Sequence, residues 1–175
     1  IMSIPIDQYL HQEVKDYIRD KYGSKKKVIS YFRKGSWQTS RYIQVSSYLK
    51  DSDIHYEYYN GEVQLHFEGK YAEDCFKNFK DFLVECTSDK HYLKWKRWQG
   101  RNKGTCVLAR NISSIDDLFQ AFSDMINIFD HPIEEYANKH ENLFSSLHKM
   151  EHFIDRSYTI QEDISVKLHK VEICN

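Results

Sequence analysis

The sequence is poor in the residues that interrupt or link structured elements: its 175 residues include six glycines and two prolines. It has no apolar run near the roughly 18 residues of a membrane span, and its first residues lack the basic and apolar regions of a signal peptide. We therefore expect a globular, cytoplasmic protein of about one domain, without long linkers and with no membrane partner.

Cysteine is also scarce, and its spacing matches no familiar site. None of the four cysteines lies in a C-x-x-C pair, and no cysteine–histidine spacing matches a structural zinc site. Cys75 and Cys86 are eleven residues apart, about three helical turns, so they would share one helix face. We expect them, with Cys106 and Cys174, to be small buried apolar residues of a reduced protein rather than a disulfide framework.

Aromatic residues are abundant at 15%, and charge is segregated although the net charge is −1. Residues 21–50 hold eight Lys/Arg and no Asp/Glu, and residues 87–112 hold seven Lys/Arg against one Asp. Residues 113–163 reverse this balance, with eleven Asp/Glu against three Lys/Arg. The sequence therefore predicts a basic, β-rich part and an acidic, helical part.

Hydrophobic periodicity predicts an α+β fold, with a mostly antiparallel sheet, amphipathic helices packed on it and a long C-terminal helical segment. The expected helices begin after Pro5, at Tyr71 and at Ser113, and Gly23 is expected to end the first of them. The expected strands and strand pairs are residues 28–32, 42–45, 54–68, 92–98, 105–110 and 164–168. We divide the chain into an α+β domain over 1–130, a helical extension over 131–157 and a tail over 158–175 with a possible last strand.

Asn60-Gly61 is the strongest local signal, because both central residues of a type I′ hairpin turn need positive φ. The two-residue loop predicts three cross-strand pairs that face the core: Tyr58 with Val63, Tyr56 with Leu65, and Ile54 with Phe67. The opposite face would carry a polar set exposed on the hairpin: His55, Glu57, Gln64, His66 and Glu68.

Two residues indicate where helices begin or are interrupted in the acidic part. Ser113 is expected to cap a helix, with Asp116 three residues on. Pro132 then predicts a kink or the start of a new helix. After it, apolar residues at spacings of three and four predict a coiled-coil or helical-hairpin seam: Ile133, Tyr136, His140, Leu143, Leu147, Met150 and Ile154.

Residues 90–98 are the best functional candidate, because lysines and arginines alternate there with aromatic rings. On a strand, Lys94 and Lys96 would share a face with Tyr92 and Trp98, where cations neutralise phosphates and rings stack on bases. The predicted nucleic-acid-binding residues are Lys94, Lys96, Arg97, Trp98, Arg101, Lys103, Lys26 and Arg33. The alternative is a solvated sheet face, or a patch that pairs with the acidic helices.

Three patterns suggest metal chemistry, and each has a simpler explanation. His55 opposite His66, near Glu57 and Glu68, could hold a transition metal, but exposed hairpins often carry such residues without using them. Two short motifs are also present, the E-x-K match Glu68-Gly69-Lys70 with Asp51 or Asp53 upstream, and the H-x-x-E-H match His148-Lys149-Met150-Glu151-His152. Both are short enough to arise by chance, and the seam would turn His148 and His152 outward. We assign no catalytic residue, no metal site and no cofactor.

One stretch resembles a known family in the order of its motifs. These are residues 63–68, the phenylalanine-rich helix, Leu93-Lys94-Trp95, and the helix from Asp117 to Tyr136 with Ile128-Phe129 near its end. Over about residues 54–140 the chain resembles an uncharacterised bacterial domain often found C-terminal to PD-(D/E)xK nuclease-like proteins. The resemblance implies an α+β accessory domain of restriction or mobile-element proteins, with a sensing or nucleic-acid-contacting role, and it carries over no catalytic residue.

We therefore expect a non-catalytic accessory or sensor-type protein that contacts DNA or RNA through its basic strands. The first alternative is a protein-interaction module, with a homodimer or another protein partner bound through residues 131–155. The second alternative is a metal-dependent nuclease.

Overall fold

A computed structural model describes residues 4–33, 36–48, 54–67, 79–97 and 104–140, except for the side chains of 31–33, 36–41 and 97. We call these ranges the described residues. The elements follow the order α1 (Gln8–Tyr22), β1 (Val28–Arg33), β2 (Ser36–Ser46), β3 (Ile54–Tyr59), β4 (Glu62–Phe67), a helical segment described over 79–86, β5 (Leu93–Arg97), β6 (Gly104–Leu108) and α3 (Ile115–Lys139). We call the described segment 79–86 the short helix; its expected start at Tyr71 lies outside the described residues. The expected α+β class is confirmed.

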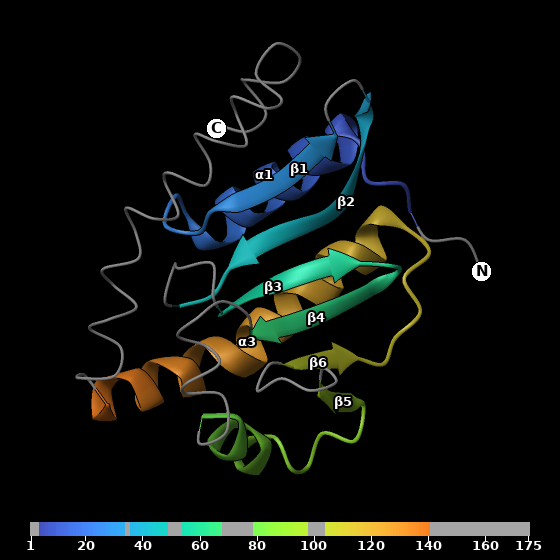
Figure 1. Ribbon diagram of the computed structural model, residues 1–175. Coiled ribbons are helices and arrows are strands. Elements are labelled where there is room, and N and C mark those ends of the chain that lie inside the picture. Colours follow the sequence, from blue (N-terminus) through green and yellow to red (C-terminus); the bar gives the residue numbers. More distant parts are fainter. Residues whose placement is uncertain (1–3, 34–35, 49–53, 68–78, 98–103, 141–175) are drawn as a thin grey trace.

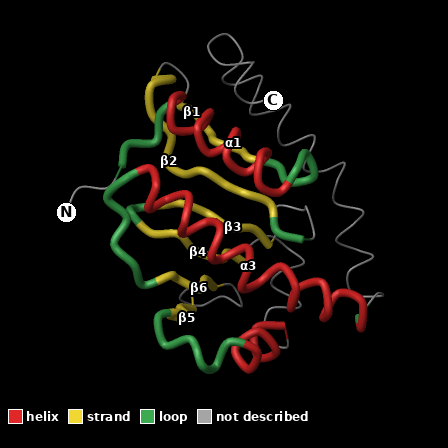
Figure 2. Tube along the Cα trace, turned by 180° about the vertical axis from the view of Figure 1, so that it is seen from behind, coloured by secondary structure: helices red, strands yellow, loops and turns green. Residues whose placement is uncertain are grey.

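The strands of the described residues form one six-stranded antiparallel sheet in the order β1-β2-β3-β4-β6-β5 (Figure 1). Helix α1 contacts β1 and β2, and α3 contacts β3 and β4. Seen from behind, α1 and α3 both lie over the same face of the sheet (Figure 2). The apolar core fills the space between this face and the helices, and the short helix joins it through Phe79 and Leu83.

The central hairpin confirms the register predicted from its turn. Asn60 has φ 51° and Gly61 has φ 79°, as a type I′ turn requires. The pairs Tyr58–Val63, Tyr56–Leu65 and Ile54–Phe67 form as expected, and all six side chains are buried in the core. Local turn chemistry therefore fixes the register of the two central strands.

Helix α1 begins and ends where the sequence predicts. Asp7 is the N-cap and accepts a hydrogen bond from the backbone N–H of Leu10, and Gly23 ends the helix at φ 80°. On the buried face of α1, His11 Nδ1 lies 2.7 Å from Ser30 Oγ of β1. This buried polar pair ties α1 to the edge of the sheet.

Helix α3 corrects the predicted cap and excludes one of the two alternatives predicted at Pro132. Its N-cap is Ser114 rather than Ser113, in a capping box with Asp117 rather than Asp116. The reason is that the Asp117 carboxylate accepts hydrogen bonds from the backbone N–H groups of both Ser113 and Ser114. In addition, no new helix begins at Pro132, because α3 runs through it to Lys139. Burial of Phe129 and Ile133 on either side of the proline holds the helix together despite one missing N–H.

Replacing Ser114 by alanine is expected to lower the free energy of unfolding by about 0.5–2 kcal/mol, the usual cost of losing an N-cap side chain. Its hydroxyl accepts from the Asp117 backbone N–H at 3.1 Å. Ser113→Ala is the matched control, because the Ser113 hydroxyl meets only the Asp117 side chain among the bonds described. Urea denaturation of both variants measures the difference, and a larger loss for Ser113→Ala would contradict this assignment of the cap.

The described cysteines differ in environment. Cys106 lies in the core, where burial raises the pKa of its thiol to about 12. Cys86, the last residue of the short helix, is exposed, contrary to expectation. Cys75 and Cys174 lie outside the described residues.

Among the helices that the structure describes, none has the length and apolarity that crossing a membrane requires.

Candidate functional site

The sheet face opposite the helices is polar from its centre to the β5 edge. Because strand side chains alternate, the register places two rows of side chains on this face. One row holds Gln44, Glu57, Gln64, Val107 and Lys94, and the next holds His55, His66, Thr105 and Lys96. The alternation itself was predicted for the hairpin, and the sheet extends it to β5.

The centre of this face is buried, which corrects the expectation of an exposed hairpin. His55 is 1% exposed, Glu57 5% and His66 6%. By contrast, Lys94 and Lys96 on the edge strand are exposed. The polar face therefore has two parts, a buried cluster over β3 and β4 and an exposed pair of lysines on β5.

The buried cluster is organised around the carboxylate of Glu57. His55 Nε2 lies 3.3 Å from Glu57 Oε1, and His66 Nε2 lies 3.1 Å from Glu57 Oε2. Gln44 donates to Glu57 Oε1 at 3.2 Å, and Gln64 Oε1 lies 2.6 Å from His66 Nε2. The two imidazole rings stack with their centroids 5.4 Å apart. We name His55, Glu57 and His66 the His–Glu–His cluster.

Burial and charge act in opposite directions on these groups. Burial by itself raises the pKa of Glu57, but the hydrogen bond from His55, the charges of both histidines and the Gln44 amide lower it overall. Burial lowers the pKa of His66 to about 4, because the nearby Glu57 carboxylate offsets only part of the desolvation. At neutral pH the cluster therefore holds an ionised carboxylate beside a neutral His66 imidazole.

The structure divides the predicted nucleic-acid-binding residues. Lys94 and Lys96 lie together on β5, and Lys96 Nζ is 3.9 Å from Glu62 Oε2. Arg97 ends the same strand, whereas Arg33 ends β1 at the opposite edge of the sheet, and neither side chain is described. Trp98, Arg101 and Lys103 lie outside the described residues.

Lys26 does not belong with the β5 lysines. Its ammonium lies 2.6 Å from Asp130 Oδ2, and its side chain is only 10% exposed. Asp130 Oδ1 also accepts from the Tyr56 hydroxyl and from the backbone N–H of Tyr48. Lys26 therefore takes part in a structural network between the sheet and α3, and we leave it out of the binding surface.

This network was missed by motif analysis, although the segregated charges contained its signal. The alternative in which basic residues pair with the acidic helices holds for Lys26 with Asp130. It also holds for Arg110, whose guanidinium lies 2.6 Å from Asp124. Neither Lys26 nor Arg110 could be matched with its acidic partner until the position of α3 against the sheet was known.

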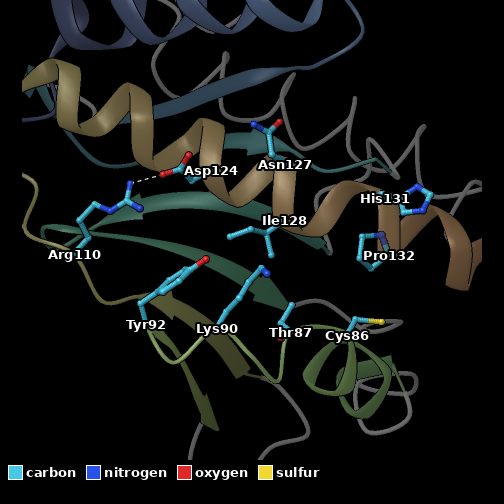
Figure 3. Close-up of a pocket in the computed structure, with 10 residues that line it drawn as sticks. All are labelled: Cys86, Thr87, Lys90, Tyr92, Arg110, Asp124, Asn127, Ile128, His131 and Pro132. Atoms are coloured by element: carbon cyan, nitrogen blue, oxygen red, sulfur yellow. Dashed lines mark hydrogen bonds and ion pairs between the residues drawn. The ribbon is translucent and has the colours of Figure 1, made fainter.

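A surface groove of about 500 Å³ lies between α3, the end of the short helix and the turn before β5 (Figure 3). The Arg110–Asp124 ion pair lies at one end, and the exposed Cys86 lies at the other. Burial and the neighbouring Glu135 and Glu85 raise the pKa of Cys86, so its thiol is protonated at neutral pH. We therefore assign this groove no nucleophile.

Tyr92 lines this groove instead of lying beside Lys94 and Lys96 (Figure 3). It precedes the first residue of β5, so strand alternation does not govern its direction. The aromatic partner expected on the lysine face is therefore not supplied by Tyr92.

The first residues of the expected C-terminal seam pack against other residues of the same chain. Ile133 and Tyr136 are buried in the core, and the Tyr136 ring stacks on Phe79 at 4.5 Å. His140 stacks on Tyr136 at 4.0 Å. The later seam positions and the tail lie outside the described residues, as do the possible metal ligands of the two short motifs: Asp51, Asp53, Glu68, Lys70, His148, Glu151 and His152.

Together these features define an α+β domain with helices on one face of an antiparallel sheet and a polar, partly buried opposite face. No family model matches the chain, and no curated protein and no solved structure matches it. The resemblance to an accessory domain of nuclease-like proteins therefore stays a prediction.

Proposed function

We propose that the protein is a non-catalytic accessory module that binds nucleic acid along the β5 edge of its sheet. The observation that carries this proposal is the placement of Lys94 and Lys96. They lie two residues apart on an edge strand and point to the face opposite the helices. Exposed lysines on a strand that is packed against the core can neutralise successive phosphates without base-specific contacts.

The packing of β5 supports this role. Leu93 is buried, and the Trp95 ring meets Phe67 and Phe129 of the core at centroid distances of 6.2 and 6.1 Å. The alternate residues therefore anchor the strand while the lysines face outward. The nearby Glu62 offsets part of their charge, but Lys96 keeps 59% of its side chain exposed.

Fluorescence anisotropy with short single- and double-stranded DNA and RNA tests the proposal. We expect binding at about 50 mM salt that weakens steeply by about 200 mM. Lys94→Glu/Lys96→Glu should weaken binding and reduce the slope of log K against log salt by about 2, or roughly one for each lost phosphate contact.

The matched control is Lys15→Glu/Lys139→Glu, which makes the same charge change on helices α1 and α3, behind the sheet. It should retain most of the affinity and the slope. Equal losses in both double variants would indicate attraction to net charge alone and contradict a β5 surface. No binding at low salt would contradict the proposal and direct attention to protein partners of residues 131–155.

The same samples, incubated with Mg²⁺ and examined on a gel, separate binding from cleavage. We expect intact nucleic acid. Mg²⁺-dependent cleavage that disappears in Glu68→Ala would instead support the nuclease alternative.

A further inference from the structure

Three metal-ligating side chains from two neighbouring strands converge on the sheet face opposite α1 and α3 (Figure 2). His55 and Glu57 are two residues apart on β3, so they share a face, and His66 is the direct partner of His55 on β4. One ligand atom from each lies within 4.8 Å of the others, and all three residues are buried. The type I′ turn fixes this register, so the convergence is built into the hairpin.

We propose that His55, Glu57 and His66 form a binding site for one divalent transition-metal ion, with Zn²⁺ the ion best suited to the donors. Two imidazoles and one carboxylate are a known zinc donor set, and they leave one coordination position open. This site is distinct from the nucleic-acid surface proposed above and does not rest on it.

The separations of the donor atoms fit such an ion. With bonds of about 2.0–2.2 Å, neighbouring ligands of tetrahedral Zn²⁺ are about 3.3–3.6 Å apart. His55 Nε2 lies 3.3 Å from Glu57 Oε1 and His66 Nε2 lies 3.1 Å from Glu57 Oε2, and one ligand atom from each of the three residues lies within 4.8 Å of the others. An ion could therefore replace the hydrogen bonds of the cluster with small side-chain movements and no change of register.

The surroundings supply an outer shell and a further oxygen. The Gln44 amide donates to Glu57 Oε1 and orients the carboxylate. Such outer contacts commonly hold metal ligands in position. Gln64 Oε1, 2.6 Å from His66 Nε2, is a further oxygen that could take the open position.

Charge also favours a bound cation. Among the described residues, the ion-pair partners of Glu57 are the two imidazoles of the cluster rather than a lysine or arginine. A buried carboxylate loses its hydration and needs a compensating positive charge. A dication between the three side chains would supply that charge.

Titration of the full-length, chelator-treated protein with Zn²⁺, monitored by calorimetry, tests the site. We expect one equivalent to bind at the His–Glu–His cluster and to raise the melting temperature, since the ion stabilises the folded state that holds it. Glu57→Gln and His66→Gln should each lower the affinity at least about tenfold, the lower end of the cost of disturbing even an outer contact. The exposed His91→Gln is the matched control and should bind as the parent does.

A second zinc candidate in the sequence must be separated from this one. His148→Gln/His152→Gln removes the H-x-x-E-H histidines and should retain the equivalent assigned to the cluster. Loss of that equivalent in this double variant, or unchanged binding in both Glu57→Gln and His66→Gln, would overturn the assignment. Absence of Zn²⁺ binding to the parent protein would overturn it as well.

Cobalt absorption keeps the proposal testable if the cluster variants fail to fold. Co²⁺ bound to the parent protein by two imidazoles and a carboxylate should give the intense visible bands of four- or five-coordinate cobalt. The weak spectrum of six-coordinate, water-rich cobalt would show that the cluster does not enclose the ion and would contradict the proposal.

Discussion

Asp130→Ala is expected to lower the free energy of unfolding by about 3 kcal/mol, the lower end of the cost of breaking a buried ion pair, because the side chains of Lys26 and Asp130 are 10% and 24% exposed. The carboxylate meets the Lys26 ammonium at 2.6 Å, the Tyr56 hydroxyl at 2.5 Å and the Tyr48 backbone N–H at 3.1 Å. Without it, Lys26 and the fully buried Tyr56 lose their shared partner. Urea denaturation followed by far-UV circular dichroism measures the loss.

Asp124→Ala provides the matched control for this prediction. Asp124 also lies on α3 and pairs with a basic residue outside the helix, but in that pair the side chains are 36% and 29% exposed. Water replaces much of such a contact, so we expect a loss of at most about 1 kcal/mol. Equal losses in the two variants would contradict the view that the less exposed Asp130 network contributes more to stability than the Asp124 ion pair.

Phe129→Ala is expected to lower the free energy of unfolding by about 3–5 kcal/mol, through lost burial and the cavity left behind. The Phe129 ring is fully buried and meets Trp95 edge to face at 6.1 Å, so it joins α3 to the edge strand. Denaturant unfolding gives the free energy, and tryptophan fluorescence reports on the packing near β5.

The control for this prediction is Tyr9→Ala, because Tyr9 is an aromatic residue 63% exposed on α1. We expect its effect to stay within about 0.5 kcal/mol. A loss below about 1 kcal/mol for Phe129→Ala would mean that neighbouring side chains collapse into the space. It would contradict the view that this ring holds β5 against the core.

The features predictable from the sequence are those that short-range chemistry decides. Asn60-Gly61 determined the hairpin and its register, and Gly23 determined where α1 ends. The predicted cap of α3 was one residue too early, because Ser113 and Ser114 each offer a hydroxyl three residues before an aspartate. Such a choice depends on backbone geometry that the residue pattern does not contain.

The sequence predicted which residues of the candidate site face each other but not that they are buried, because burial depends on contacts distant in sequence. Alternation placed His55 opposite His66, but nothing in the hairpin indicated that both would be shielded from water. Lys26 shows the same limit, since its basic neighbours suggested a binding surface while its actual partner is Asp130, over a hundred residues away. The predicted direction of the Tyr92 side chain was wrong, because strand alternation was extended to the residue before β5 begins.

The position of β5 at the end of the sheet formed by the described residues also bears on the colloidal behaviour of the protein. A terminal strand presents backbone groups that can pair with a second copy, and such pairing starts edge-to-edge aggregation. Lys94 and Lys96 place two positive charges along this strand, so two copies brought edge to edge would repel each other. The residues proposed to meet phosphates would thus also keep the free protein monodisperse, and polyanions that neutralise them would remove this protection.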